Sequence, residues 1–220
     1  MTPLVDWVYA AKQLGVYAIM GVAMTLLAGG IMFLSDPLGA AFIVLWLLWG
    51  VAIASGRGRG EASIHEKKQH SIVALSGLLS FPLMMLAPWE HVTFGGPLPR
   101  DGFAPWVGIL LFAIGVGLQW WSLRELGSFY TTHLGIQEGH RLITSGPYSL
   151  VRHPGYLSSF MVLAGMALSM GSLCVVAATF VSTAVMIWRI GGEEEMLVEA
   201  FGDEYREYRR RTRRLFPRIW

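Results

Sequence analysis

The fold of this chain is decided by residues 156–188, which read YLSSFMVLAGMALSMGSLCVVAATFVSTAVMIW and contain no charged side chain. A helix needs about 20 apolar residues to cross the hydrocarbon core of a bilayer. This stretch is too long for one such helix and short for two. Gly171 and Ser172 near its middle are a turn signal. The stretch therefore predicts a tight hairpin of two short membrane helices.

Four further apolar segments precede the hairpin, at residues 14–34, 38–54, 72–87 and 103–123. The chain of 220 residues is 54% hydrophobic and 15% charged, whereas soluble domains carry about 25% charged residues. We therefore expect an all-α, polytopic integral membrane protein with about six membrane helices. The first helix is expected to be retained, because Asp6 and Lys12 precede a full-length span rather than the short apolar region of a signal peptide.

Lysine and arginine residues gather in alternate loops, and this bias sets the orientation of the helices. They lie between the second and third segments, between the fourth segment and the hairpin, and after the hairpin, whereas the opposite side carries only Arg100. With six crossings, all the basic loops fall on one side, which is the cytoplasmic side. Both termini are therefore expected to be cytoplasmic.

We expect a single membrane domain over residues 1–220, with a four-helix N-terminal part at 1–123 and a different C-terminal part at 124–220. The glycines of the first part are interpreted as helix-packing positions. The basic loop at 56–60 is interpreted as positive-inside, and no nucleic-acid partner is expected. The one cysteine, Cys174, excludes an internal disulfide.

A polar, arginine-rich helix is expected to begin at Glu193, after the hairpin. Its apolar residues recur at steps of three and four and are Leu197, Phe201, Tyr205, Tyr208, Thr212 and Leu215. Such spacing marks one face of a helix. An amphipathic helix of this kind beside a membrane is predicted to lie at the interface.

Two polar clusters flank the hairpin on the same side of the membrane. The first covers residues 140–148 and 152–156, and the second contains Arg189, Glu193 and Glu194. Because a short hairpin brings its two ends together, the clusters are predicted to converge at the membrane boundary. Charged and aromatic side chains that meet in this way are typical of a small-molecule site.

Each of these side chains also has a plainer interpretation. His153 before Pro154 could cap the following helix, and Arg152 could be a membrane anchor. Arg189 and Glu193 could be a surface ion pair, because they are four residues apart. The histidines lack a tight ligand spacing or a cysteine partner, so no metal site is expected. The joint pattern nevertheless favours a functional site.

The motifs in this region resemble those of the isoprenylcysteine carboxyl methyltransferase family. His140 is followed by the Gly146-Pro147-Tyr148 step and by the element Arg152-His153-Pro154-Gly155-Tyr156. The C-terminal signature is matched by Glu193-Glu194, Leu197, Phe201-Gly202, Tyr205, Tyr208 and Pro217. The resemblance covers residues 120–220 and implies that 124–220 is the cofactor-binding and catalytic part of a membrane methyltransferase.

The resemblance also implies a cofactor and its ligands. The cofactor would be S-adenosylmethionine, and its pocket would be lined by Gln137, His140, Arg141, Leu142, Ile143, Tyr148, His153, Pro154, Gly155, Tyr156 and Glu193. Arg189 would bind the methyl acceptor, which makes Arg189 and Glu193 the candidate catalytic residues. The acceptor would be a lipid or lipidated small molecule, most simply a prenylcysteine-type carboxylate. The active site would face the cytoplasm, in the inner or plasma membrane of a bacterium or the endoplasmic reticulum of a eukaryote.

These assignments agree with the chemistry of methyl transfer. Glu193 can neutralise the cofactor ammonium through a charge-assisted hydrogen bond, and tyrosine faces can accommodate the sulfonium. A carboxylate acceptor is already nucleophilic at neutral pH, and the planar fork of Arg189 is suited to holding it. Alignment of acceptor, methyl and sulfur then supplies much of the rate.

Two stretches of the sequence leave the acceptor and the reaction open. Gly191-Gly192 is expected to weaken the helix between Arg189 and Glu193, and Leu157-Ser158-Ser159 departs from the family pattern where the lipid would bind. The acceptor could instead be a phospholipid amine or a thiol. An NADPH-dependent membrane reductase of the sterol type and a non-catalytic membrane scaffold are two further hypotheses.

Overall fold

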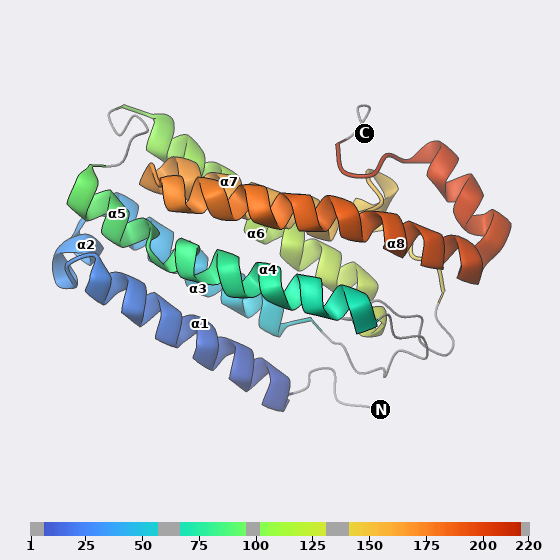
Figure 1. Cartoon of the computed structure of the whole chain (residues 1–220), viewed down its shortest axis with the longest axis horizontal. Coiled ribbons are helices and arrows are strands. Elements are labelled where there is room, and N and C mark those ends of the chain that lie inside the picture. Colours follow the sequence, from blue (N-terminus) through green and yellow to red (C-terminus); the bar gives the residue numbers. More distant parts are fainter. Residues whose placement is uncertain (1–6, 57–66, 96–101, 131–140, 217–220) are drawn as a thin grey trace.

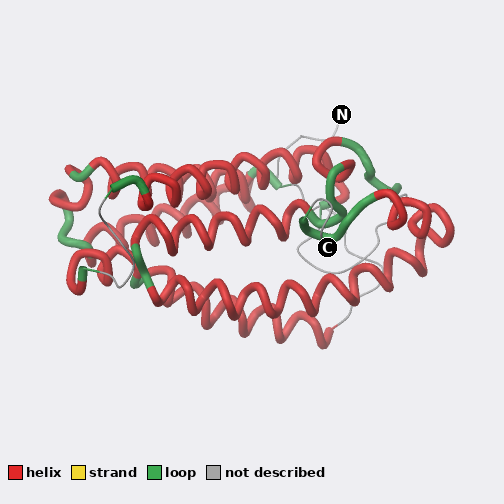
Figure 2. The backbone as a smooth tube through the Cα atoms, turned by 90° about the horizontal axis from the view of Figure 1, so that it is seen from above, coloured by secondary structure: helices red, strands yellow, loops and turns green. Residues whose placement is uncertain are grey.

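The computed structural model describes residues 7–56, 67–95, 102–130 and 141–216, with the backbone alone at residues 67–74 and 128. The described residues form helices and connecting loops (Figures 1 and 2). The α-helices are α1 (Trp7–Leu27), α2 (Ile31–Ser35), α3 (Pro37–Ala54), α4 (Lys67–Met85), α5 (Ala87–Phe94), α6 (Ala104–Leu126), α7 (Pro154–Met170) and α8 (Leu173–Arg211). Two short 3-10 helices, η1 (Gly127–Phe129) and η2 (Gly146–Ser149), lie between α6 and α7.

The long helices run side by side along the length of the molecule (Figure 1). α1 packs on α3, α4 packs on α8, and α6 packs along α7. α3 also contacts α6, and α7 contacts α8, so the pairs form one bundle. The helices of both sequence halves therefore surround a common interior.

Small residues bring α6 and α7 close together. A Cβ atom added to Gly108 would lie 2.3 Å from the backbone nitrogen of Ser169, and one added to Gly165 would lie 2.5 Å from that of Phe112. Backbone atoms cannot move aside as side-chain ends can. The two helices therefore approach so closely only because these positions lack side chains, as is common between membrane helices.

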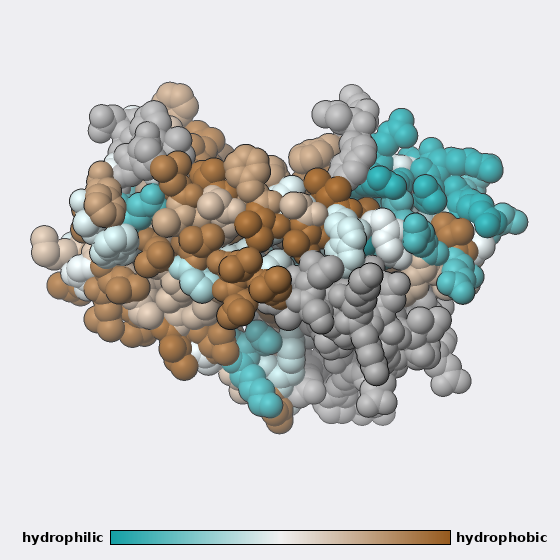
Figure 3. Space-filling view, in the orientation of Figure 1, coloured by the Kyte–Doolittle hydropathy of each residue, from teal (hydrophilic) through white to brown (hydrophobic). Residues whose placement is uncertain are grey.

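The outer surface of the bundle is apolar, as expected of a protein that lies in lipid. On the face seen in Figure 3, hydrophobic side chains cover much of the described helical bundle, and hydrophilic ones gather around the C-terminal limb of α8. Within the described residues, α1, α3, α6 and α8 are long and apolar enough to cross a membrane, and α7 is a shorter apolar helix of 17 residues. The prediction of an all-α membrane protein is confirmed, whereas the number of six crossings remains a prediction.

The hairpin predicted around Gly171 and Ser172 is confirmed. α7 ends at Met170, and Gly171 takes the left-handed conformation with φ 62° that glycine adopts without steric penalty. Ser172 then caps α8, because its hydroxyl oxygen accepts from the backbone N–H of Val175 at 3.1 Å. Glu90 of α5 supports the same turn and accepts from the backbone N–H groups of Leu173 and Cys174 at 3.0 and 3.1 Å.

Several predicted boundaries were wrong. The first apolar helix was placed at 14–34, but α1 covers Trp7–Leu27 and is followed by Gly29 and Gly30, which both have positive φ. Apolar composition continues through these glycines, so hydropathy alone does not detect the break. The third segment, placed at 72–87, is divided between α4 and α5.

The polar helix predicted to begin at Glu193 is the continuation of α8. The helix is not interrupted at Gly191-Gly192, and its break lies at Gly202, where φ is 54° and ψ is −122°. Each interior glycine costs about 1 kcal/mol relative to alanine. Packing of the fully buried Ile190 and of the nearly buried Glu194 on either side of the pair offsets this cost.

The predicted apolar face of the polar helix packs on the protein. Beyond Gly202 the chain turns back toward the start of α7 (Figure 1). As a result Tyr205 and Tyr208 of that face are buried. Thr212 and Leu215 are also buried, but they lie beyond the end of α8 at Arg211, so the predicted helix was too long. Arg206 and Arg210 of this limb are exposed.

Candidate functional site

A cavity of about 560 Å³ opens at the end of the bundle where α6 ends and α7 begins. The polar residues Arg152, His153, Arg189 and Glu193 line one end of the cavity, which we call the mouth. The other walls are mainly apolar and come from α1, α3, α4, α6, α7 and α8. A charged mouth over an apolar interior suits a ligand that has a polar end and a lipid-like end.

Most of the residues singled out from the sequence lie at this cavity. Those that line it are Leu142, Ile143, Tyr148, Arg152, His153, Gly155, Tyr156, Arg189 and Glu193. Pro154 is buried as the first residue of α7, and Arg141 is exposed in the preceding loop. Gln137 and His140 lie outside the described residues.

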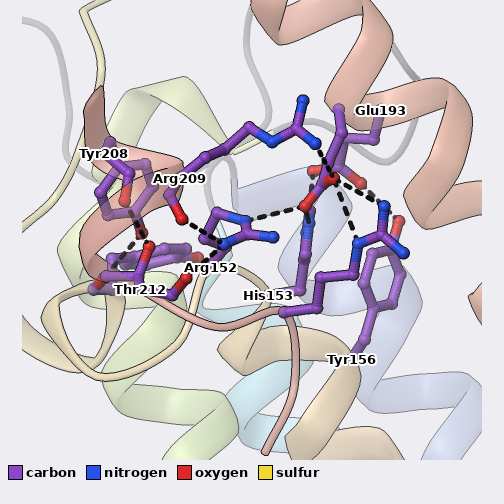
Figure 4. A network of polar contacts seen from close by, with 10 residues as sticks. Arg152, His153, Tyr156, Glu193, Tyr208, Arg209 and Thr212 are labelled. Carbon is purple, nitrogen blue, oxygen red and sulfur yellow. Dashed lines mark hydrogen bonds and ion pairs between the residues drawn. The ribbon is translucent and has the colours of Figure 1, made fainter. Parts of the chain in front are cut away.

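Glu193, Tyr156 and Arg189 lie together at the mouth, and Figure 4 shows Glu193 and Tyr156 beside His153. The Tyr156 hydroxyl donates to Oε2 of Glu193 at 2.7 Å, and Arg189 acts electrostatically on the same side chain. Nδ1 of His153 lies 3.8 Å from Oε1 of Glu193. The Glu193 carboxylate is expected to bind the cofactor and the Arg189 guanidinium the acceptor. The two groups thus lie one helical turn apart on α8, and both interact with Tyr156.

Glu194, the next residue, holds a separate network that the sequence did not reveal (Figure 4). Its Oε1 accepts from Nε of Arg152 at 2.8 Å, and its Oε2 accepts from Nη2 of Arg214 at 3.1 Å. Nε2 of His153 lies 3.4 Å from Oε1, so the His153 side chain contacts Glu194 rather than capping α7. A buried carboxylate is tolerated here because several cations surround it.

Glu194 lies beyond the charge-free stretch of α8, and its pKa is set by opposing effects. Burial raises the pKa, but hydrogen bonds from His153, Arg152 and Arg214 outweigh burial and lower the pKa to about 2. Glu194 is therefore ionised over the whole physiological range. The side chain is only 3% exposed, so its charge is compensated by the protein rather than by water.

The C-terminal segment is attached directly to the start of the α7 region. The backbone N–H groups of Arg152 and His153 donate to the carbonyls of Arg213 and Arg214 at 2.7 and 3.0 Å. The Tyr208 hydroxyl donates to the carbonyl of Tyr148 at 2.6 Å. Segments about 60 residues apart in the chain therefore form one wall of the site, which depends on the turn at Gly202.

The N-terminal half contributes to the cavity, although its sequence was interpreted as packing alone. Tyr17 of α1 and Trp49 of α3 line the interior, and their rings lie 5.6 Å apart in an edge-on arrangement. On the other side, the hydroxyls of Ser80 on α4 and Ser182 on α8 are 2.9 Å apart. Aromatic and hydroxyl residues of membrane helices often serve only to pack the helices together. The sequence therefore contains no separate signal that these four residues line a cavity.

The described residues form a bundle of apolar helices with charged side chains at one end of a cavity, and comparison with known proteins defines the class as membrane methyltransferases. The family model described as phospholipid methyltransferase matches residues 103–204. A probable protein-S-isoprenylcysteine O-methyltransferase from Oryza sativa subsp. indica is 31% identical over 166 residues, which is 72% of this chain and 86% of that protein. The chain belongs to the isoprenylcysteine carboxyl methyltransferase family.

Other similarities are more partial. The human protein-S-isoprenylcysteine O-methyltransferase is 27% identical over 68% of this chain and 51% of its own length. The cobalt-zinc-cadmium resistance protein CzcN of Cupriavidus metallidurans is 33% identical over 52% of each chain. The matched region is thus about half the length of these two relatives. A solved structure of the eukaryotic intramembrane Ras methyltransferase ICMT covers 96% of this chain and 75% of its own, with a TM-score of 0.59 and 22% identity, and supports the fold.

Proposed function

We propose that this protein transfers a methyl group from S-adenosylmethionine to the carboxylate of a lipid-like acceptor of the prenylcysteine type, at the cytoplasmic face of a membrane. One observation carries the proposal. Glu193 and Arg189 lie one turn apart on α8 and line, together with Tyr156, the mouth of a cavity with mainly apolar walls. The cationic ammonium of the cofactor and the anionic carboxylate of the acceptor would therefore bind at neighbouring positions.

The side chains at the mouth fit the charge pattern of the methyl donor. Glu193 is an anion for the cofactor ammonium, and charge-assisted hydrogen bonds are among the strongest in proteins. Tyr148 and Tyr156 line the cavity and offer aromatic faces to a sulfonium. When bound, the cofactor supplies an electrophilic methyl group. The chain would supply the orientation of donor and acceptor and would keep water from the reacting atoms.

The acceptor end fits a carboxylate. Arg189 presents two parallel N–H donors, which match the two oxygens of a carboxylate. A carboxylate needs no general base, so the acceptor side requires positioning rather than proton transfer. The apolar walls below the mouth would hold the hydrocarbon part of the acceptor. The match to the phospholipid methyltransferase family keeps a phospholipid amine as the second candidate acceptor.

Cofactor binding is the first test. Purified protein is titrated with S-adenosylmethionine and, separately, with NADPH, which a reductase would bind. We expect binding of S-adenosylmethionine alone. Glu193→Gln should weaken it by about 1.5–3 kcal/mol, because a hydrogen bond to a charged group is lost. Glu195→Gln is the matched control, because Glu195 is exposed beside the site. Unchanged affinity in a folded Glu193→Gln protein would remove Glu193 from the cofactor site.

Methyl transfer is then measured with an N-acetylated S-prenylcysteine and with phosphatidylethanolamine vesicles. Arg189→Lys keeps the charge but loses the planar fork, so transfer to the prenylcysteine should fall at least roughly tenfold, or about 1.4 kcal/mol. Cofactor affinity should stay within a few-fold of the wild type. Loss of cofactor binding together with turnover would contradict this division of roles, and methylation of the vesicles alone would favour the amine acceptor.

A further inference from the structure

The Tyr205 hydroxyl is a buried polar group at the site that the proposed reaction does not yet use. Tyr205 is 1% exposed and lines the cavity. Its hydroxyl has no hydrogen-bond partner within the described residues. Buried polar groups in proteins are nearly always paired, so an unpaired one at a binding cavity suggests a partner that arrives with the ligand.

A turn at Gly202 places Tyr205 at the cavity. Gly202 has φ 54° and ψ −122°, and the limb that follows it folds back over the start of α7. Tyr208, three residues later, packs against Tyr205 with 5.9 Å between ring centroids. The Tyr208 hydroxyl already donates to the carbonyl of Tyr148 at 2.6 Å. Of these two neighbouring buried tyrosines, the described part of the protein thus supplies a hydrogen-bond partner for Tyr208 and none for Tyr205.

Charged side chains of both signs surround Tyr205. Arg152, Glu193 and Glu194 are its electrostatic neighbours. The Glu194 carboxylate is already held by Arg152 and by Arg214. The charge of Glu194 is thus compensated within the protein. An ammonium bound at Glu193 would compensate the second carboxylate, so that an anionic group of the same ligand beside Tyr205 would meet the guanidinium of Arg152 without facing an uncompensated carboxylate.

We infer that the Tyr205 hydroxyl donates a hydrogen bond to the carboxylate of the methyl donor's amino-acid end, while Glu193 binds the adjacent ammonium. The inference rests on the proposed function, since it assigns one more contact of the same cofactor. The ammonium and the carboxylate of an α-amino acid share one carbon, so side chains that bind them must face the same part of a cavity, and Glu193 and Tyr205 line the same cavity. The Tyr205 hydroxyl is thus held in place for this contact before the ligand binds.

The test uses Tyr205→Phe and Tyr208→Phe in the full chain, each of which removes only a hydroxyl. Affinity is measured for S-adenosylmethionine and for decarboxylated S-adenosylmethionine, which lacks only the carboxylate. Tyr205→Phe should lower the affinity for S-adenosylmethionine by about 10- to 100-fold, because a hydrogen bond to a charged group is lost. It should leave the affinity for the decarboxylated compound within about twofold. Glu193→Gln should lower the affinity for both ligands.

Thermal unfolding without ligand supplies the second readout. Tyr205→Phe should unfold at the wild-type temperature or above it, because removing an unpaired buried hydroxyl breaks no bond. Tyr208→Phe should unfold at a lower temperature, because it loses a bond made in the free protein, and any change in its affinity should be equal for the two ligands.

Three outcomes would overturn the inference: equal weakening of both ligands by Tyr205→Phe, no weakening of either, or a loss of unliganded stability like that of Tyr208→Phe. A wild-type protein that binds neither compound would overturn the proposed function instead.

Discussion

Glu194 shows how one side chain organises the charged end of the bundle. It is 2% exposed and gathers Arg152, His153 and Arg214 from two segments on either side of it in the sequence. Arg209 lies further away, with Nη2 3.8 Å from Oε2. Without this carboxylate, the guanidinium of Arg152, itself only 8% exposed, would be buried beside other cations. Glu194 therefore holds the wall against which Glu193 and Tyr156 are positioned.

The same carboxylate should make the stability of the protein depend on pH. The pKa of Glu194 is about 2 in the folded protein, against an ordinary value of 4.5. A carboxyl group whose pKa is lower in the folded state than in the unfolded state stabilises the folded state at pH values above its unfolded-state pKa. This contribution is lost as the pH falls through its folded-state pKa. We expect the contribution, about 3 kcal/mol, to disappear between about pH 4.5 and 2. Thermal unfolding should therefore change more steeply with pH in the wild type than in Glu194→Gln.

Glu195→Gln is the control for that measurement, since Glu195 is the adjacent exposed acid. Its unfolding temperature should follow the wild-type curve at every pH. If Glu194→Gln also follows the wild-type curve in this window, the carboxylate does not stabilise the fold.

At the scale of elements, the contact of α6 with α7 is the most sensitive to side-chain size. Gly165→Ala places a methyl group 2.5 Å from the backbone nitrogen of Phe112, so the helices must separate. Overpacking of this kind costs about 1–3 kcal/mol. Gly117→Ala on α6 is the matched control, because an added Cβ meets nothing within 4 Å there. Thermal unfolding of the two variants in one detergent compares them, and equal stability would mean that the helices adjust freely.

The elements also show how far the sequence could predict this protein. The hairpin was predictable because its signals are local: an uncharged stretch and a glycine at the turn. The convergence of Tyr156 with Arg189 and Glu193 followed from that hairpin and from the family motifs. These predictions needed only neighbouring residues and the length of a helix.

Other features depend on contacts between distant residues and could not be predicted in this way. α8 continues through Gly191-Gly192 because buried neighbours compensate for the glycines, and it bends at Gly202 instead. The bend brings Arg214 to Glu194 and leaves Tyr205 at the cavity. Glu90 supports the start of α8 from 83 residues earlier in the chain. No periodicity or spacing in the sequence reports such contacts.

At the scale of the whole molecule, the open prediction is orientation. Thr144 and Ser35 are exposed at opposite ends of the bundle, beside the site and beside α3 respectively. In a Cys174→Ala background, Thr144→Cys should be labelled by a membrane-impermeant reagent from the cytoplasmic side, and Ser35→Cys from the other side. The positive-inside bias is the physical reason. Labelling of Thr144→Cys from the non-cytoplasmic side would reverse the proposed orientation, and labelling of both from one side would exclude a spanning bundle.

The position of Arg189 and Glu193 on one continuous helix has a consequence for how the sequence can vary in evolution. An α-helix turns by about 100° per residue. One residue inserted or deleted between the two would therefore swing the guanidinium and the carboxylate to different sides of α8. The interval of four residues must keep its length in any relative that uses both groups.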